Sequence, residues 1–173
     1  FIANRYSKDI PLALTATLVF EQSYGFIDGD SASAIELCAL LSAISDIPIK
    51  QCFAVTGSVD QNGRVQAIGA VNEKIEGFYE ACKVKGGAKD KAVIIPQANV
   101  KHLMLNKEIV TAAKKQEFKI YAVENIDQML SLLTGINAGH KNDQGIYPVE
   151  SVNGKVQSSI NALSDKLKKL KGS

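Results

Sequence analysis

Strand-like and helix-like segments alternate along most of this chain, and no other feature constrains its fold as strongly. Short runs rich in β-branched residues are each followed by a longer segment whose apolar residues recur at helical spacing. This alternation predicts an α/β sandwich in which helices cover several strands. The expected strands are 12–21, 51–57, 64–69, 92–96 and 119–123, and the expected helices are 31–45, 71–85, 99–115 and 126–134.

The last part of the chain departs from this alternation. Residues 136–150 have the composition of a loop, whereas the following segment carries apolar residues at helical spacing with lysines opposite them. We therefore expect a domain at 1–135, a loop or linker at 136–150 and a C-terminal amphipathic helix at 151–173. The opening letters "FIANRYSKD" resemble the end of a helix already under way, so we expect an excised part of a longer protein, truncated at the N-terminal side of this domain.

Composition and charge exclude several classes of partner. A chain of 173 residues with 46% hydrophobic content can bury one core, and its formal net charge of +2 does not favour nucleic-acid or membrane binding. No stretch approaches the ~20 apolar residues that a membrane span requires. The three cysteines form no Cys-x-x-Cys pair, which favours core packing in a reducing compartment and predicts a cytoplasmic location.

The stretch "GFIDGDSASAIELCALL" at 25–41 places small residues directly before an apolar helix. Small residues allow the backbone amides at a helix start to approach a phosphate, a carboxylate or a scissile carbonyl closely. Phosphate binding of the P-loop type is disfavoured, because the stretch lacks the terminal Gly-Lys-Ser/Thr of that motif. Ser31 is therefore a candidate nucleophile that requires a base.

Histidine and metal chemistry find little support in the sequence. A Ser-His-Asp relay would have to use His102 or His140, and neither lies in a context of Ser or Asp residues that favours a relay. No cluster of His, Cys and carboxylate residues has the spacing of metal ligands. We expect no metal and no cofactor within these residues.

Lys74 is the lysine that best suits the role of base. Most other lysines lie in polar runs, whereas Lys74 borders the apolar stripe of the predicted helix 71–85 and falls in its first turn. Burial and the helix dipole would both favour a neutral amine there. The alternative is a lysine whose aliphatic stem merely covers core residues while its amine reaches solvent.

Two motifs carry a resemblance to a known family. The letters "DGDSAS" followed by "AVTGSVDQNGRVQAIGAVNEKIEG" resemble the proteolytic domain of the Lon family of ATP-dependent proteases, in particular its Lon-like (LonB-type) branch. The resemblance covers about 12–133. It implies the Lon proteolytic-domain fold, an α/β fold similar to domain 2 of ribosomal protein S5, with helices packed on a mixed sheet.

The resemblance also implies roles for particular residues. Ser31 would be the nucleophile and Lys74 the general base of a Ser-Lys dyad, and the hydroxyl of Thr56 would orient the lysine amine. An acidic residue of regulatory or structural role is matched by Asp28. Amides around Asp30 at the helix start, beside Gly29, would form an oxyanion hole. The sequence departs from the family pattern at Ala70, where a second glycine is usual, and the added methyl group would constrain the turn that delivers the lysine.

Beyond these residues, the resemblance implies a serine endopeptidase that cleaves unfolded polypeptides. It further implies an upstream AAA+ module that uses ATP and Mg²⁺ and a six-membered ring, and this sequence contains no Walker motif of its own. An alternative keeps the fold without the chemistry, as a non-proteolytic scaffold that assembles an AAA+ motor. A small-molecule kinase of related topology would require a Gly/Ser-rich phosphate loop, which is absent from the sequence.

Overall fold

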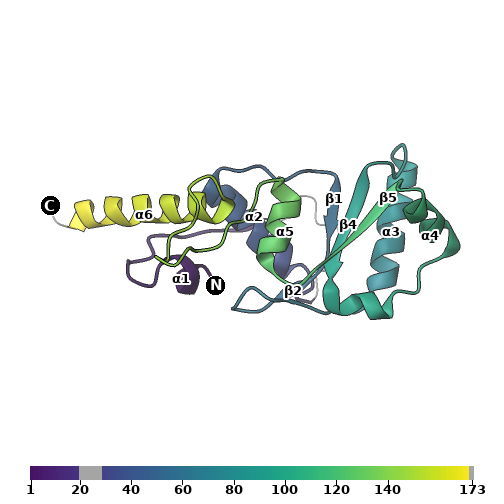
Figure 1. The fold of residues 1–173 in the computed structure, drawn as a ribbon, viewed down its shortest axis with the longest axis horizontal. Coiled ribbons are helices and arrows are strands. Elements are labelled where there is room, and N and C mark those ends of the chain that lie inside the picture. Colours follow the sequence, from purple (N-terminus) through teal and green to yellow (C-terminus); the bar gives the residue numbers. More distant parts are fainter. Residues whose placement is uncertain (20–28, 172–173) are drawn as a thin grey trace. The chain divides into compact units, whose positions relative to one another are not determined.

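A computed structural model of the chain describes residues 1–19 and 29–171, which form two compact units (Figure 1). The central unit comprises Gly29–Ile35 and Lys50–Met129. The terminal unit comprises the described parts of Phe1–Asp28, Glu36–Ile49 and Leu130–Ser173. Helices α2 (Ser33–Ser45) and α5 (Ile126–Thr134) each contribute residues to both units. Three of the predicted site residues, Ser31, Thr56 and Lys74, all belong to the central unit.

The central unit is built on a parallel sheet. Its strands are β1 (Phe53–Val55), β4 (Lys91–Pro96) and β5 (Phe118–Val123), in the order β1-β4-β5. Residues 92–96 of the middle strand are all buried, which is typical of a parallel strand covered on both faces. Strands β2 (Ser58–Val59) and β3 (Val65–Gln66) form a separate antiparallel ribbon. The predicted α/β class is confirmed, although the described strands form a parallel sheet and a ribbon instead of one mixed sheet.

Helices α3 (Val71–Val84) and α4 (Lys107–Lys114) pack on this sheet and close the core of the central unit (Figure 1). The buried positions of α3 recur every three or four residues, so one face of the helix meets β4. The ring of Phe118 lies edge-on to that of Tyr79, with 5.1 Å between their centroids. Burying a side chain such as Ile75 contributes about 1.5–3 kcal/mol, so this packing fixes α3 firmly on the sheet.

The terminal unit packs helix α1 (Ile2–Tyr6) against helix α6 (Val152–Lys171). The hydroxyl of Tyr6 donates to Asn153 Oδ1 at 2.6 Å, and Gln157 Nε2 donates to the carbonyl of Tyr6 at 2.7 Å. Val152, Val156 and Ile160 on α6 are buried. Helix α6 therefore lies within the range predicted for an amphipathic helix, and its first half carries the buried face.

Three local predictions are wrong. Residues 12–19 form no strand with the rest of the described chain, and the end of that predicted strand, together with Asp28, lies outside the described residues. The helix predicted at 99–115 is divided into a 3-10 helix η1 (Gln97–His102) and α4, because the side chain of Asn106 caps a new helix by accepting from the amide of Ile109. Helix α2 begins two residues later than predicted, which leaves Ser31 in the preceding turn.

Candidate functional site

The turn that carries Ser31 is the first component of the site. Gly29 takes a left-handed conformation with φ of 86°, and the carbonyl of Asp30 accepts a hydrogen bond of 2.9 Å from the amide of Ser33, the first residue of α2. Gly29 and Asp30 are exposed, and Ser31 is half-buried. The amides of Ser31 and Ala32 donate to no residue within the described ranges.

Backbone hydrogen bonds hold this turn against the end of β1. The amide of Gly57 donates to the carbonyl of Ser31 at 2.7 Å, and the carbonyl of Gly57 accepts from the amide of Ala34 at 3.1 Å. A side chain at Gly57 would not fit easily, because a Cβ built there would lie 3.0 Å from Cγ1 of Val65. The absent side chain lets the two backbones approach and fixes the position of Ser31.

Lys74 approaches Ser31 from the first turn of α3. Ala70 precedes this helix in a left-handed conformation (φ 56°, ψ 37°), and its carbonyl accepts from the amide of Lys74 at 3.1 Å. The Nζ of Lys74 donates to Oγ of Ser31 at 2.8 Å and to Oγ1 of Thr56 at 3.4 Å. The first distance falls within the range of about 2.6–3.2 Å that proton transfer requires.

Thr56 connects the two halves of the site. Its amide donates to the carbonyl of Ile94 on β4 at 3.1 Å, and its hydroxyl donates to the carbonyl of Ser31 at 3.4 Å. The residue is buried at the end of β1, so its hydroxyl is directed by the sheet. The lysine amine therefore meets two hydroxyl oxygens at once, which defines its direction.

The side chain of Lys74 is exposed in this chain. The sequence left two placements open, an amine partly buried at the edge of the apolar stripe and an amine that reaches solvent, and the exposure matches the second. The position of Lys74 at the edge of the apolar stripe explains its exposure, because the buried stripe of α3 is formed by Val71, Ile75, Tyr79 and Cys82 and the lysine extends beside it. Lys74 lies in the first turn of α3, as predicted, but the chain alone does not bury its amine.

The remaining sequence candidates lie elsewhere. Asp28 is outside the described residues, so the structure gives it no place. The backbone of His102 takes part in a hydrogen bond with Asn72, and His140 belongs to a loop of the terminal unit. In neither 1–19 nor 29–171 do three His, Cys, Asp or Glu side chains gather in a way that would hold a metal ion.

Two asparagines near Lys74 were not singled out from the sequence. The side chain of Asn99 in η1 exchanges two hydrogen bonds with the backbone of Ile68, at 2.9 and 3.0 Å. That of Asn72 donates to the carbonyl of His102 at 3.1 Å and accepts from the amide of Met104 at 2.8 Å. The segment after β4 is largely polar, so the sequence carried no signal for Asn99, and its role follows from its burial, since buried amides are almost always hydrogen-bonded.

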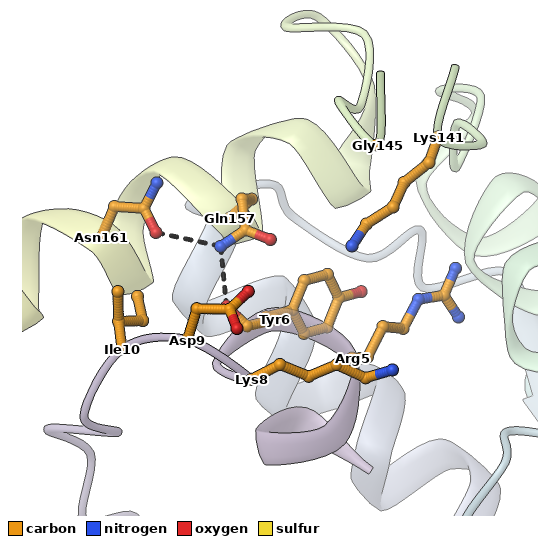
Figure 2. Close-up of a pocket in the computed structure, with 9 residues that line it drawn as sticks. All are labelled: Arg5, Tyr6, Lys8, Asp9, Ile10, Lys141, Gly145, Gln157 and Asn161. Atoms are coloured by element: carbon orange, nitrogen blue, oxygen red, sulfur yellow. Dashed lines mark hydrogen bonds between the residues drawn. The ribbon is translucent and has the colours of Figure 1, made fainter. Parts of the chain in front are cut away.

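A separate cavity of about 240 Å³ lies in the terminal unit (Figure 2). Its lining includes three cations, Arg5, Lys8 and Lys141, and one carboxylate, Asp9. Figure 2 shows the amide of Gln157 bridging to Asn161 and to the backbone of Tyr6 across its rim. None of the dyad residues lines this cavity, so the candidate site remains the one around Ser31.

Comparison with known proteins identifies the family of the chain. The sequence profile of the Lon protease (S16) C-terminal proteolytic domain matches residues 25–135, which is more than half of the chain. The chain therefore belongs to the Lon protease family and contains its C-terminal proteolytic domain. The match includes all three residues that meet at the candidate site.

Individual relatives support the same assignment. The chain is 46% identical over 136 residues to a Lon protease homolog of Escherichia coli (strain K12), covering 79% of this chain and 23% of that protein. It is 43% identical over 163 residues to a Lon protease homolog of Haemophilus influenzae, covering 93% and 27%, respectively. An archaeal Lon protease of Methanocaldococcus jannaschii is 44% identical over 127 residues, covering 73% and 17%. The chain thus spans about a quarter or less of the length of these relatives.

No helix in the described part of the chain combines the length and the apolar character that crossing a membrane requires.

Proposed function

We propose that this domain is a serine endopeptidase in which Ser31 is the nucleophile and Lys74 the general base. The observation that carries the proposal is the 2.8 Å hydrogen bond from Nζ of Lys74 to Oγ of Ser31, formed between side chains from two different elements. Membership of the Lon protease family supports the same reaction class and a protein substrate.

The geometry suggests how the proton moves. Lys74, once neutral, accepts the proton of Ser31 as Oγ attacks the peptide carbonyl, and the resulting ammonium then donates it to the leaving amine. A water molecule, deprotonated by the same amine, hydrolyses the acyl-enzyme and restores the serine. Thr56 is a positioning residue in this scheme, because its hydroxyl accepts from Nζ and limits the directions in which the amine points.

Substrate binding completes the environment of the site. The amine is exposed in the chain alone, so a peptide covering it would remove water and disfavour the ammonium. The unbonded amides of Ser31 and Ala32 near the start of α2 would then face the carbonyl oxygen as it gains charge, beside Asp30 and Gly29. We place the oxyanion hole there.

For the whole protein we propose ATP-dependent degradation of unfolded polypeptides in the cytoplasm. An upstream AAA+ module would bind ATP and Mg²⁺ and form a hexamer, since the relatives are more than three times as long as this chain and this sequence contains no Walker motif. The proposed domain limits are 1–135 for the proteolytic domain, 136–150 for a linker and 151–173 for the C-terminal helix. We further propose the ribosomal protein S5 domain 2-like fold for the proteolytic domain.

The scaffold alternative predicts no use for the contact between Ser31 and Lys74. A domain that serves only to assemble a motor has no need of an amine within 2.8 Å of a serine hydroxyl, nor of a threonine beside both. These contacts favour the peptidase.

A fluorophosphonate probe, which forms a covalent bond with activated serines, tests the proposal directly. We expect labelling of the chain at Ser31, identified by peptide mass spectrometry, and no labelling of Ser31→Ala. Ser158→Ala, which changes an exposed serine on α6, is the matched control and should label normally. Labelling that persists in Ser31→Ala would exclude Ser31 as the nucleophile, and absence of labelling in every form would favour the scaffold.

A further inference from the structure

We infer that Asn99 is a positioning residue that holds Lys74 within reach of Ser31, an inference that rests on the proposed peptidase function. Asn99 touches neither dyad residue in the hydrogen bonds of the site. Its effect runs through the backbone segment 68–74, which leads from the β2–β3 ribbon into α3.

The side chain of Asn99 pairs with this segment as a neighbouring strand would. Its Nδ2 donates to the carbonyl of Ile68 at 2.9 Å, and its Oδ1 accepts from the amide of Ile68 at 3.0 Å. Asn99 is only 3% exposed, and loss of its side chain would remove the partners of the amide and the carbonyl of half-buried Ile68. We call this pair of bonds the Asn99 clip.

The segment that the clip holds is strained. Two residues after Ile68, Ala70 takes a left-handed conformation that costs a non-glycine residue about 1–2 kcal/mol. Such a conformation persists only where the surrounding structure determines it from more than one side. The Asn99 clip holds the backbone before Ala70, at Ile68. Asn72, which bonds to His102 and Met104, holds the backbone after it.

Thr56 and the backbone segment that leads to Lys74 are both held by β4 and the helix that follows it. β4 fixes Thr56 through the carbonyl of Ile94, and η1, which follows β4 directly, fixes Ile68 through Asn99. The carbonyl of Ala70 then accepts from the amide of Lys74, which sets the start of the helical turn. A small shift of this turn would move the amine away from Ser31, and a misplacement of about 1 Å can cost 100-fold in rate.

The test measures the saturable rate of fluorophosphonate labelling at Ser31 in the full chain. In Asn99→Ala we expect the limiting rate constant to fall about 10- to 100-fold while the probe concentration at half-saturation changes less than twofold. Asn62→Ala, an exposed asparagine in the ribbon turn, is the matched control and should label normally. The double variant Asn99→Ala, Ala70→Gly should label at least threefold faster than Asn99→Ala, because glycine adopts the left-handed conformation without strain.

Amide hydrogen exchange tests the role of Asn99 independently of whether Ser31 is the nucleophile. The amide of Lys74 should exchange faster in Asn99→Ala than in the unchanged chain, whether or not Ser31 labels. If Ser31→Ala retains labelling, the peptidase proposal fails, and the exchange rate still decides whether Asn99 fixes the turn. If Asn99→Ala does not fold, Asn72→Ala should give a smaller fall of about threefold with the same faster exchange. Unchanged exchange and labelling in a folded variant would overturn the inference.

Discussion

The two turns that deliver Ser31 and Lys74 are fixed in different ways. The Ser31 turn is held by backbone groups of Gly57, and its left-handed residue is a glycine, Gly29. The Lys74 turn is held by the side chains of Asn99 and Asn72, and its left-handed residue is an alanine. The first turn is therefore sensitive to added volume, whereas the second is sensitive to the loss of a side chain.

Adding one methyl group beside the Ser31 turn should have the largest effect on stability. Gly57→Ala would place Cβ 3.0 Å from Cγ1 of Val65 and 3.5 Å from Cγ of Pro96, so Val65 or the backbone at Gly57 must shift. We expect a loss of about 1–3 kcal/mol in the free energy of unfolding, measured by urea denaturation, with slower labelling of Ser31.

Gly77→Ala is the matched control for this substitution. Gly77 lies inside α3, and a Cβ there would meet nothing within 4 Å. This variant should gain about 0.5–1 kcal/mol, because alanine favours the helix. Equal effects at the two glycines would show that close packing at Gly57 does not hold the turn.

Relief of strain in the Lys74 turn should raise the free energy of unfolding, by less than Gly57→Ala lowers it. Ala70→Gly removes the penalty for φ of 56°, partly offset by the greater freedom of glycine in the unfolded chain. We expect a gain of about 0.5–1 kcal/mol in the free energy of unfolding and no loss of labelling. A destabilised variant would mean that the methyl group makes favourable contacts that outweigh the strain.

Loss of the Asn99 side chain should not change the C-terminal end of α3, where Cys82 lies. Burial raises the pKa of the Cys82 thiol, so its reactive thiolate is scarcer at pH 8 than that of an ordinary cysteine. If the Asn99 clip fixes only the start of α3, iodoacetamide should modify Cys82 at the same slow rate in Asn99→Ala as in the unchanged chain. Faster modification would indicate that the whole helix has loosened, and the role of Asn99 would be general stability.

The sequence indicated the candidate residues of the site but not the contacts that position them. Small residues before an apolar helix, and one lysine at the edge of an apolar stripe, made Ser31 and Lys74 candidates, and the family resemblance assigned their roles. The structure places the two side chains in hydrogen-bond contact. The partners of Asn99 and Asn72 could not be predicted, because an amide side chain can pair with any backbone that the tertiary fold brings near it. Ala70 was noticed only as a departure from the family pattern, and its left-handed backbone explains why glycine suits that position.

The limits of the fold prediction have a similar cause. Periodicity located α3 and α5 closely, since each buries a regular face or stripe. The β-rich pattern before residue 20 predicted a strand, but a strand forms only where a neighbour pairs with it, and residues 12–19 have none among the described residues. The exposure of Lys74 likewise depends on what covers the helix start, which helical spacing does not specify.

The pH dependence of Ser31 labelling tests the central claim most directly. A protonated amine cannot accept the serine proton, so labelling of the unchanged chain should rise with pH through a single ionisation and then level off. Lys74→Ala should lose that ionisation together with about 100-fold or more of the rate, while Lys101→Ala, which changes an exposed lysine of η1, should keep both. A profile in Lys74→Ala that matches the unchanged chain in shape and rate would contradict a lysine base and with it the proposed dyad.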